Sequence, residues 1–533
     1  MAAWSPLRVR AFRMLWIGTA ATNLGAWMQI VGAQWTLVAD MGGEALVALV
    51  HTATTLPVLL LAMPAGALAD IVNRTRLLIG AQLFIAGVAV MMTVLDATGG
   101  LEPGLLLMST FALGVGAALS APAIGALIPD LVPRGELVEA AALGAISVNV
   151  ARAVGPAIAG LIVAVTGATT VFALNAVAAL AFVTLLVFGR IGPKGVADDR
   201  ERFTAAISAG GRYVRHTRVV RRILLRAVLF VVPATVIWAL LPLFAGRDLR
   251  LGPDGYGLLL GALGVGAILG AVLLPRLPAG PSTNRTVAVA SLAYAGTLVA
   301  MAVLRRPVPL MLCLVPAGVA WVAILANVNA QIQLFLPAWV RARGLAVYQV
   351  AVIGGQAVAA GCWGLLGHLF GLPVAFLAAA GMLVAGVLTA ARWPLPDTRG
   401  VNQQPAAYWP EPHLIMEPEP VAGPVLVTVT YSVRPDRQDA FVDAMAPVEQ
   451  ARRRTGASRY RLFREGEVPD RYVEAFLVPS WDEHLRQHHL RLTRDEQAQE
   501  RAAAALADGP PVIRHLLPLA GTPDHGKGSS VGA

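Results

Sequence analysis

Residues 66–76, with the sequence GALADIVNRTR, place a glycine, an acid and two arginines between two long apolar runs. A glycine near a helix end allows a neighbouring helix to come close. An acid and bases just outside the hydrocarbon can form ion pairs that hold one conformation and release it again. The sequence therefore predicts a gating element at Gly66, Asp70, Arg74 and Arg76. The alternative is a capped loop that follows an apolar helix and has no gating role.

A second group of residues lies in the apolar run 141–165, in the sequence NVARAVGPAIAG. A charged side chain within a membrane span costs at least about 2.5 kcal/mol, so Arg152 is expected to face a cavity or a partner. Snorkelling of its head toward the interface is the alternative. Small residues allow close helix contact, and a proline lets the helix bend. The residues on about one face of this helix are Asn149, Arg152, Gly155, Pro156 and Gly160.

Amide side chains recur at helical spacing in other apolar runs. Asn327 and Gln331 share one face of the run 309–335, whereas Asn329 and Gln333 share another. Interhelical hydrogen bonding is the alternative for any single amide. As a set, these side chains predict a largely neutral, amphipathic cavity with one guanidinium. The predicted cavity residues are Asn23, Trp27, Gln34, Asn149, Arg152, Asn327, Gln331, Gln349 and Gln356.

The elements that must position these residues are membrane-spanning helices. The chain has 533 residues, of which 56% are hydrophobic and 14% charged, against about one quarter charged in soluble proteins. Each apolar run is long enough to cross about 30 Å of hydrocarbon as a helix. Twelve runs are predicted to span the membrane: 12–38, 46–69, 77–95, 105–128, 141–165, 169–188, 223–245, 256–275, 286–304, 309–335, 343–367 and 373–391.

Arginines collect in alternate loops, which predicts that both termini are cytoplasmic. The opposite loops hold only Arg247, Arg250, Arg305 and Arg306. The basic segment 190–222 divides the spans six and six, as either an amphipathic surface helix or a solvated charge run. We therefore predict a six-helix bundle at 1–189, a cytoplasmic connector at 190–222 and a second six-helix bundle at 223–399. Two pseudo-symmetric bundles of this kind can rock about a central site.

A weak internal repeat supports the division. The sequence PDLVPRGEL after the fourth run resembles PAWVRARGL after the tenth. Gly167, followed five residues later by Phe172, resembles Gly371, followed five residues later by Phe376. Duplication of one bundle would place similar segments at these positions.

These segments resemble the major facilitator superfamily of transporters. GALADIVNRTR resembles its loop motif G-x-L-a-D-r-x-G-r-k, although Ile71, Asn73 and Thr75 depart from it. VGPAIAG, which contains Gly155, Pro156 and Gly160, resembles the antiporter motif of the same superfamily. With NLGAWMQ near residue 23, the chain resembles the secretion-effector branch, related to enterobactin exporters. The resemblance implies twelve helices, of which the third, sixth, ninth and twelfth face lipid while the others surround a cavity, together with alternating access and export.

The composition changes after the last apolar run. A Pro-rich linker is predicted at 400–423, a small α+β domain at 424–520 and a disordered tail at 521–533. The order β-α-β-β-α-β is ferredoxin-like, and this domain resembles the dimeric α+β barrel of antibiotic-biosynthesis monooxygenases. That resemblance implies a homodimer formed through the sheets. His484 and His488 have a spacing compatible with a metal, but a surface or dimer-packing role is preferred because no third ligand is evident.

The predicted function is secondary active export of a small amphipathic drug, siderophore or secondary metabolite by alternating access, in a bacterial inner membrane. If export is coupled to protons, the candidate groups are Asp40, Asp70 and His51, because no acid lies in the middle of a span. Uptake is one alternative, and a membrane-tethered monooxygenase-like enzyme is another. We expect a small-molecule substrate and membrane lipid as partners, and no enzyme activity, cofactor, metal site or nucleic-acid partner.

Overall fold

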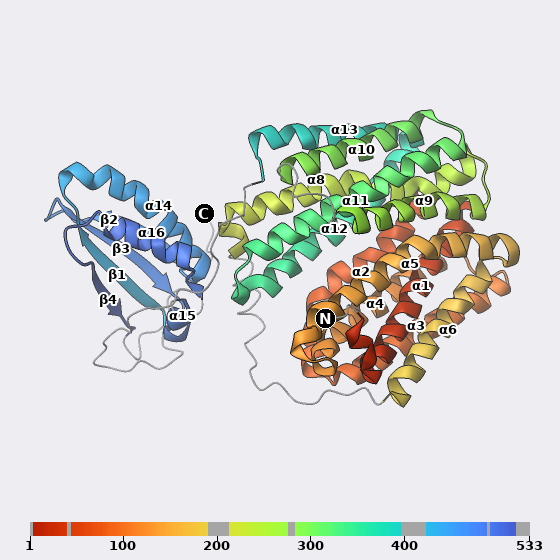
Figure 1. Cartoon of the computed structure of the whole chain (residues 1–533), viewed down its shortest axis with the longest axis horizontal. Coiled ribbons are helices and arrows are strands. Elements are labelled where there is room, and N and C mark those ends of the chain that lie inside the picture. Colours follow the sequence, from red (N-terminus) through yellow and green to blue (C-terminus); the bar gives the residue numbers. More distant parts are fainter. Residues whose placement is uncertain are drawn as a thin grey trace, which may run out of the picture. The chain divides into compact units, whose positions relative to one another are not determined.

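The computed structural model of the chain (Figure 1) describes residues 4–39, 44–189, 213–274, 283–395, 423–487 and 491–518. Some side chains within these ranges, Asp70 among them, lie outside the description. Most of the predicted connector, the predicted linker at 400–422, the terminal segment 521–533 and Asp40 also fall outside the described residues.

Twelve helices of 21 to 33 residues in the described part of the chain coincide with the twelve predicted spans. Ten helical segments are long and apolar enough to cross a membrane, which confirms the predicted fold class. The two other helices are α1, which carries many polar residues, and α2, whose described apolar part is the shorter segment Ala45–Leu61. The helices are α1 (Arg10–Ala39), α2 (Glu44–Ile71), α3 (Arg74–Ala97), α4 (Pro103–Leu131), α5 (Leu137–Thr166), α6 (Ala168–Phe188), α8 (Arg218–Leu243), α9 (Pro253–Leu273), α10 (Thr283–Val303), α11 (Pro307–Phe335), α12 (Ala338–Phe370) and α13 (Leu372–Arg392).

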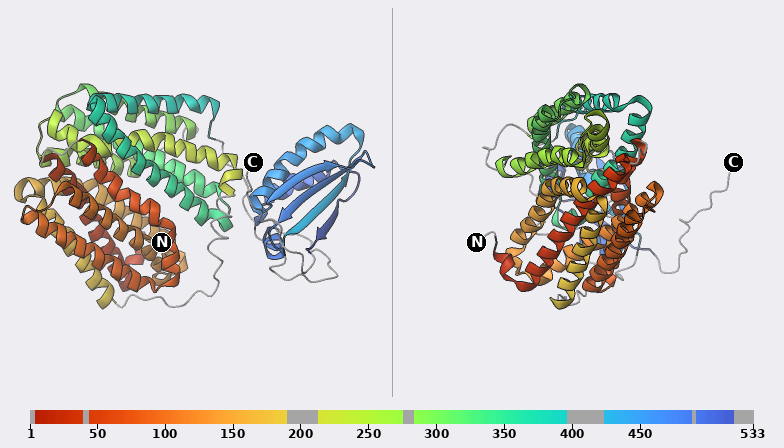
Figure 2. Two further views of the ribbon diagram at one scale, coloured as in Figure 1. Left: turned by 180° about the vertical axis from the view of Figure 1, so that it is seen from behind. Right: turned by 90° about the vertical axis from the view of Figure 1, so that its right-hand side faces the viewer.

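The helices form two bundles, α1–α6 (red to yellow) and α8–α13 (yellow-green to teal), which can be followed by colour in both views of Figure 2. The sequence repeat has a structural counterpart in them. Gly167 separates α5 from α6 and Gly371 separates α12 from α13, and both have φ of 85°, a conformation that glycine adopts without strain. Phe172 and Phe376 follow them and are fully buried. The same turn and the same buried ring therefore recur in each bundle.

The bundles meet where α1 ends and α2 begins. Thr52 Oγ1 of α2 donates a hydrogen bond to Ala357 O of α12 (2.8 Å). Gln34 of α1 donates to Trp238 O of α8 (3.2 Å) and accepts from the hydroxyl of Tyr256 of α9 (2.6 Å). These bonds use amide and hydroxyl groups that would otherwise lack partners in hydrocarbon. They tie the first bundle to the second at this end.

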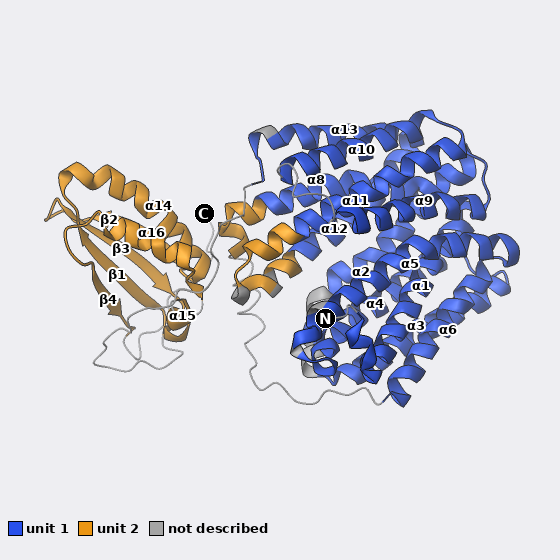
Figure 3. Cartoon of the chain, in the orientation of Figure 1, with its two compact units in different colours: residues 1–200, 222–329, 348–395 blue, residues 201–221, 330–347, 396–533 orange. Residues whose placement is uncertain are grey.

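The chain divides into two compact units, shown in Figure 3. Met1–Arg200, Arg222–Asn329 and Tyr348–Leu395 form the first, and Glu201–Arg221, Ala330–Val347 and Pro396–Ala533 form the second. The second unit contains a four-stranded antiparallel sheet in the order β2-β3-β1-β4. The predicted order β-α-β-β-α-β is present, with two helices in the second helical region. The elements are β1 (Val425–Ser432), α14 (Gln438–Thr455), β2 (Arg459–Arg464), β3 (Arg471–Val478), α15 (Trp481–Arg486), α16 (Arg494–Ala504) and β4 (Val512–Leu516).

The alternation of side chains along β1 and β3 builds the core of this domain. Val427, Val429 and Phe476 are buried and pack with Phe441 and Met445 of α14, whereas their neighbours along the strands point to the opposite face. A period of two is what a strand with one covered face requires.

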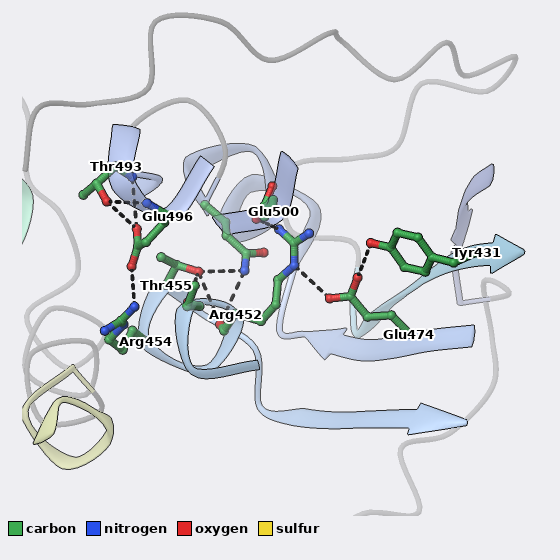
Figure 4. A network of polar contacts seen from close by, with 10 residues as sticks. Tyr431, Arg452, Arg454, Thr455, Glu474, Thr493, Glu496 and Glu500 are labelled. Carbon is green, nitrogen blue, oxygen red and sulfur yellow. Dashed lines mark hydrogen bonds and ion pairs between the residues drawn. The ribbon is translucent and has the colours of Figure 1, made fainter. Parts of the chain in front are cut away.

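A buried polar network joins the helices of this domain to its sheet (Figure 4). Arg452 of α14 is 5% exposed and lies 3.0 Å from Glu474 of β3 and 2.7 Å from Glu500 of α16. Tyr431 of β1 donates to Glu474 (3.2 Å). Burial raises the pKa of Glu500 to about 7, and the neighbouring acids Glu474 and Glu496 add to the rise while Arg452 opposes it. Loss of one member would leave a buried charge uncompensated.

Candidate functional site

The candidate site is a cavity of about 500 Å³ within the first unit. Helices α1, α2 and α5 of the first bundle and α8, α11 and α12 of the second contribute its walls. A cavity of this size suits a drug-sized molecule. The described lining residues are Trp27, Ile30, His51, Thr54, Thr55, Asn149, Arg152, Trp238, Trp321, Val322, Leu325, Ala326, Asn329, Tyr348, Gln349, Val352, Ile353 and Gln356.

Five of the nine predicted cavity residues lie in this lining: Trp27, Asn149, Arg152, Gln349 and Gln356. They come from helices α1, α5 and α12, so residues from both bundles meet at the cavity. Asn149 also donates a hydrogen bond to Ala145 O one turn back in its own helix (2.9 Å). His51 of α2 and Gln356 of α12 both line the cavity, one on each bundle.

The other four predicted residues are not among the described residues of the lining. Asn23 of α1 donates to Ser147 Oγ of α5 (3.2 Å), and Gln34 bonds to α8 and α9. Asn327 donates to Ala323 O in its own helix (2.8 Å), and Gln331 belongs to the second unit. The alternative of interhelical hydrogen bonding therefore describes Asn23 and Gln34. On α11 it is Asn329, on the other predicted face, that lines the cavity.

Aromatic side chains of the second bundle were missed by reasoning from amides alone. Trp238 of α8, Trp321 of α11 and Tyr348 of α12 line the cavity. The ring centroids of Trp27 and Trp238 are 5.6 Å apart, and those of Trp238 and Trp321 are 5.8 Å apart. The three indoles therefore form one continuous aromatic wall that crosses from one bundle to the other. Large aromatic residues in otherwise aliphatic spans are the sequence signal that could have indicated them.

Arg152 is the single arginine among the described lining residues. Its guanidinium carbon lies 5.6 Å from the centroid of the Trp27 ring, within cation–π range. No carboxylate of the described residues forms an ion pair with it, and its Nε is buried without a hydrogen-bond partner. His51 lies on the α2 wall of the same cavity and is 8% exposed. The cavity thus places one permanent positive charge and one imidazole beside an aromatic wall.

The predicted gating stretch spans the end of α2 and the start of α3. Asn73 caps α3, since its side chain accepts hydrogen bonds from the backbone of Thr75 and Arg76 (both 3.1 Å). The asparagine that departs from the family motif thus serves as an N-cap. Arg74 forms an ion pair with Asp130 of α4 (2.9 Å) and donates to Ala126 O (3.1 Å), so it joins helices of the same bundle.

Gly66 has no described atom within 4 Å of the position of an added Cβ, so the predicted close helix approach is not found there in the described part of the structure. The side chain of Asp70 lies outside the described residues. The role of this stretch in gating remains a prediction.

The antiporter-like residues lie at contacts of α5 with its neighbours. A Cβ added at Gly155 would lie 3.0 Å from Trp27 Cβ of α1. A Cβ added at Gly160 would lie 2.9 Å from Gly257 Cα of α9, and one at Gly257 would lie 2.8 Å from Pro156 O. Only glycine fits at the last two positions without movement of a helix, so the motif packs the first bundle against the second.

In the second unit, His484 is 1% exposed, and its Nε2 lies 3.0 Å from Nε2 of His515. Trp481, at the start of α15, packs against both rings. The prediction was a surface or dimer-packing role, and the surface role is wrong for His484 because α15 buries this residue, whereas the dimer-packing role stays a prediction. His488 lies outside the described residues. Among the residues that the structure describes, no group of three His, Cys, Asp or Glu side chains could hold a metal.

The family model described as transmembrane secretion effector matches residues 1–522. The staphyloferrin A transporter of Staphylococcus aureus is 23% identical over 257 residues, which is 48% of this chain and 64% of that protein. The chain therefore matches less than two thirds of that relative's length. The multidrug efflux pump Tap of Mycolicibacterium fortuitum is 28% identical over 400 residues, 70% of this chain and 94% of the pump.

Solved structures of transporters share the fold. A bacterial homologue of the human lysosomal transporter Spinster, in an inward-facing and unoccupied conformation, aligns with a TM-score of 0.56 at 16% sequence identity. The alignment covers 73% of this chain and 95% of that protein. At this identity the likeness concerns the arrangement of the helices alone.

Proposed function

The chain belongs to the transmembrane secretion effector family of major facilitator transporters, and from this premise we propose that it exports a small amphipathic molecule by alternating access. The cavity between the two bundles carries the proposal, because it combines an aromatic wall with a few polar side chains from both bundles. Such a lining suits a molecule with an apolar body and a polar group. Efflux by the pump Tap, which matches along most of its length, supports the outward direction.

Alternating access requires contacts between the bundles that can separate. The hydrogen bonds of Thr52 and Gln34 and the contact of Gly160 with Gly257 all lie toward the end where α1 ends and α2 begins. Few bonds and small residues hold this end, so the bundles can part there as rigid bodies. We assign this conformation to the state that is closed on this side of the membrane.

The arginine distribution assigns the closed end to the outside, with both termini in the cytoplasm of a bacterium. Arg305 is one of the few arginines in the loops that this distribution places outside. Its guanidinium lies 3.5 Å from the carboxylate of Asp248 and 5.6 Å from the centroid of the Phe244 ring. An arginine that is paired in this way is a weaker topological signal than an unpaired one.

Proton coupling is a finer part of the proposal, and His51 is its candidate group. Of the three groups that the sequence indicated, His51 is the one whose described side chain lines the cavity. It lies beside Gln356 of the opposite bundle, so a change of its charge would act on the contact between the bundles.

The second unit is proposed to form a homodimer through the face of its sheet that its described helices leave uncovered. Phe463, Val512 and Leu516 are each 53% exposed. The pairing of the strands places them on the face opposite the core, in line with Val473, Thr430, Leu477 and Leu426. Large apolar side chains that are left exposed on a sheet face favour association with a second copy, and the exposed Arg461 and Arg514 lie on the same face. Phe463→Asp should convert a dimer of the full chain into a monomer in detergent, as measured by light scattering.

Cells that express the chain would test export. Accumulation of aromatic amphiphiles of different charge should fall relative to cells with the empty vector. Ala326→Trp fills the cavity from α11 and should abolish the effect. The matched control is Leu312→Trp on the same helix, where the side chain is 70% exposed and should tolerate the change. A rise in accumulation would establish uptake, and an unchanged effect in Ala326→Trp would exclude this cavity as the route.

The membrane-tethered enzyme is tested by removal of residues 424–533. Export should persist without this segment if the helices alone translocate the substrate. Loss of export, together with a product that depends on the segment, would favour the enzyme instead.

A further inference from the structure

The described lining of the cavity carries a positive side chain and no negative one. Eighteen described residues line it, and they include Arg152 but no aspartate or glutamate. Among the described residues, the Arg152 guanidinium has one charged or aromatic contact, the face of Trp27. A cation without a counterion within a membrane span is costly, because its surroundings have low polarity. A ligand anion would supply the missing partner.

Two indole hydrogen-bond donors of residues that line the cavity have no acceptor among the described residues. Trp238 and Trp321 are 9% and 5% exposed, and neither indole Nε1 has a hydrogen-bond partner among the described residues. An indole N–H can only donate, and a buried donor without an acceptor destabilises the state that contains it. In this conformation the two nitrogens are covered, so a small movement of the rings is needed before they meet a ligand. The complementary ligand group is rich in acceptors.

The geometry of the hydrogen-bond donors restricts the chemical class of the ligand. A guanidinium is planar and presents parallel N–H groups that match the two oxygens of a carboxylate. The three indoles next to it offer flat apolar surfaces that suit an aromatic ring more than a flexible alkyl chain. A cationic ligand would face Arg152 with no described acid in the lining to compensate for the repulsion.

Given the proposed transport function, on which this inference rests, we infer that the substrate is an amphipathic aromatic carboxylate. Its carboxylate binds Arg152 and its ring lies against the wall of Trp27, Trp238 and Trp321. Cationic amphiphiles are poor substrates, because Arg152 repels a positive charge. A fatty acid shares the carboxylate but not the ring, so it binds more weakly.

The test measures binding to the purified full chain in detergent. Pyrenebutyrate, its neutral primary amide and the cation pyrenebutylamine share one fluorescent body, and energy transfer from the cavity tryptophans reports their binding. Pyrenebutyrate should bind at least about tenfold more tightly than the amide or the amine, because a charge-assisted pair replaces a weaker contact. Dodecanoate should compete poorly for the site, whereas a lipid-like substrate would compete well and would contradict the aromatic assignment.

Variants of the cavity residues distinguish the loss of a charge or donor from a loss of folding. Arg152→Gln should weaken pyrenebutyrate binding by about ten- to a hundredfold and leave the amide unchanged, whereas Arg152→Lys should retain most of the preference. Trp321→Phe keeps a ring and removes one donor, so it should weaken the carboxylate more than the amide. The matched control is Arg13→Gln, since Arg13 is exposed at the start of α1 and should not affect any probe.

The outcomes distinguish this inference from the proposed function. Equal binding of the three probes, or tighter binding of the amine, would overturn the carboxylate assignment even if the protein transports other molecules. Unchanged pyrenebutyrate binding in a folded Arg152→Gln variant would overturn it as well. Selective binding of pyrenebutyrate without translocation in proteoliposomes would support the carboxylate site and contradict the transport function.

Discussion

The contact between α5 and α9 predicts the effect of a single methyl group at Gly160. In Gly160→Ala the new Cβ would lie 2.9 Å from Gly257 Cα and closer still to Pro253 O, where an ordinary contact begins at 3.4 Å. The added atom is therefore at least about 0.5 Å too close to backbone that cannot rotate away. The helices must separate, and such overpacking costs about 1 to 3 kcal/mol. If the bundles part at this end in the other state, the equilibrium shifts toward that state by about 5- to 150-fold.

Gly144→Ala is the matched control on the same helix. A Cβ at Gly144 has no atom within 4 Å among the described residues, and both changes add about 1 kcal/mol of helix propensity. Spin labels at Thr166→Cys and Arg250→Cys, near the ends of α5 and α9, would report the separation by pulsed electron paramagnetic resonance. Cys313 and Cys362 are first replaced by serine.

The ratio of long to short distances should rise in Gly160→Ala and stay unchanged in Gly144→Ala. Equal distance distributions in the two variants would refute the reasoning, because they would mean that α5 and α9 do not form a tight contact at Gly160. A fall in the ratio would refute it as well, since a clash cannot stabilise the closed end.

Three further predictions concern other parts of the chain. His51→Gln should remove the sensitivity of export to a protonophore, measured as dye efflux from cells, and retained sensitivity would exclude His51 as the coupling group. A double-mutant cycle of Arg74→Gln and Asp130→Asn should give a coupling of about 0.5 to 1 kcal/mol in thermal unfolding, because both side chains are partly exposed, and additivity would contradict the ion pair. Because the folded-state pKa of Glu500 is raised to about 7 from 4.5, its contribution to stability is full below pH 4.5 and is lost as pH rises toward 7. The free energy of unfolding of residues 424–520, which contain their own core, should therefore decline by up to about 3 kcal/mol over this pH range when it is measured with urea. Glu500→Gln should remove this decline. A decline that persists in Glu500→Gln would show that another group titrates.

The membrane-spanning elements could be predicted because their cause is local. A backbone in hydrocarbon must satisfy its own hydrogen bonds, so a run of about twenty apolar residues becomes a helix whatever its neighbours are. The turns at Gly167 and Gly371 were predictable for a similar reason, since a backbone conformation with positive φ selects glycine. The strands of the second unit followed from alternation along the chain.

The lining of the cavity was only partly predictable, because lipid is as apolar as the interior of a bundle. No hydrophobic pattern then tells which face of a helix points inward, and polar side chains alone mark it. The amides of Gln34 and Asn23 serve contacts between helices, while Asn329 rather than Asn327 reaches the cavity.

The sequence by itself determined the spans, their division into two sets, the charge of Arg152 and the succession of strands and helices along the second unit. Only the tertiary structure decided that three tryptophans from two bundles form one wall, that Gly160 meets Gly257, and that His484 is buried. The physical reason is the range of the interactions. Helix and strand formation depend on neighbours a few residues apart, whereas a cavity depends on how distant helices rotate and pack against one another.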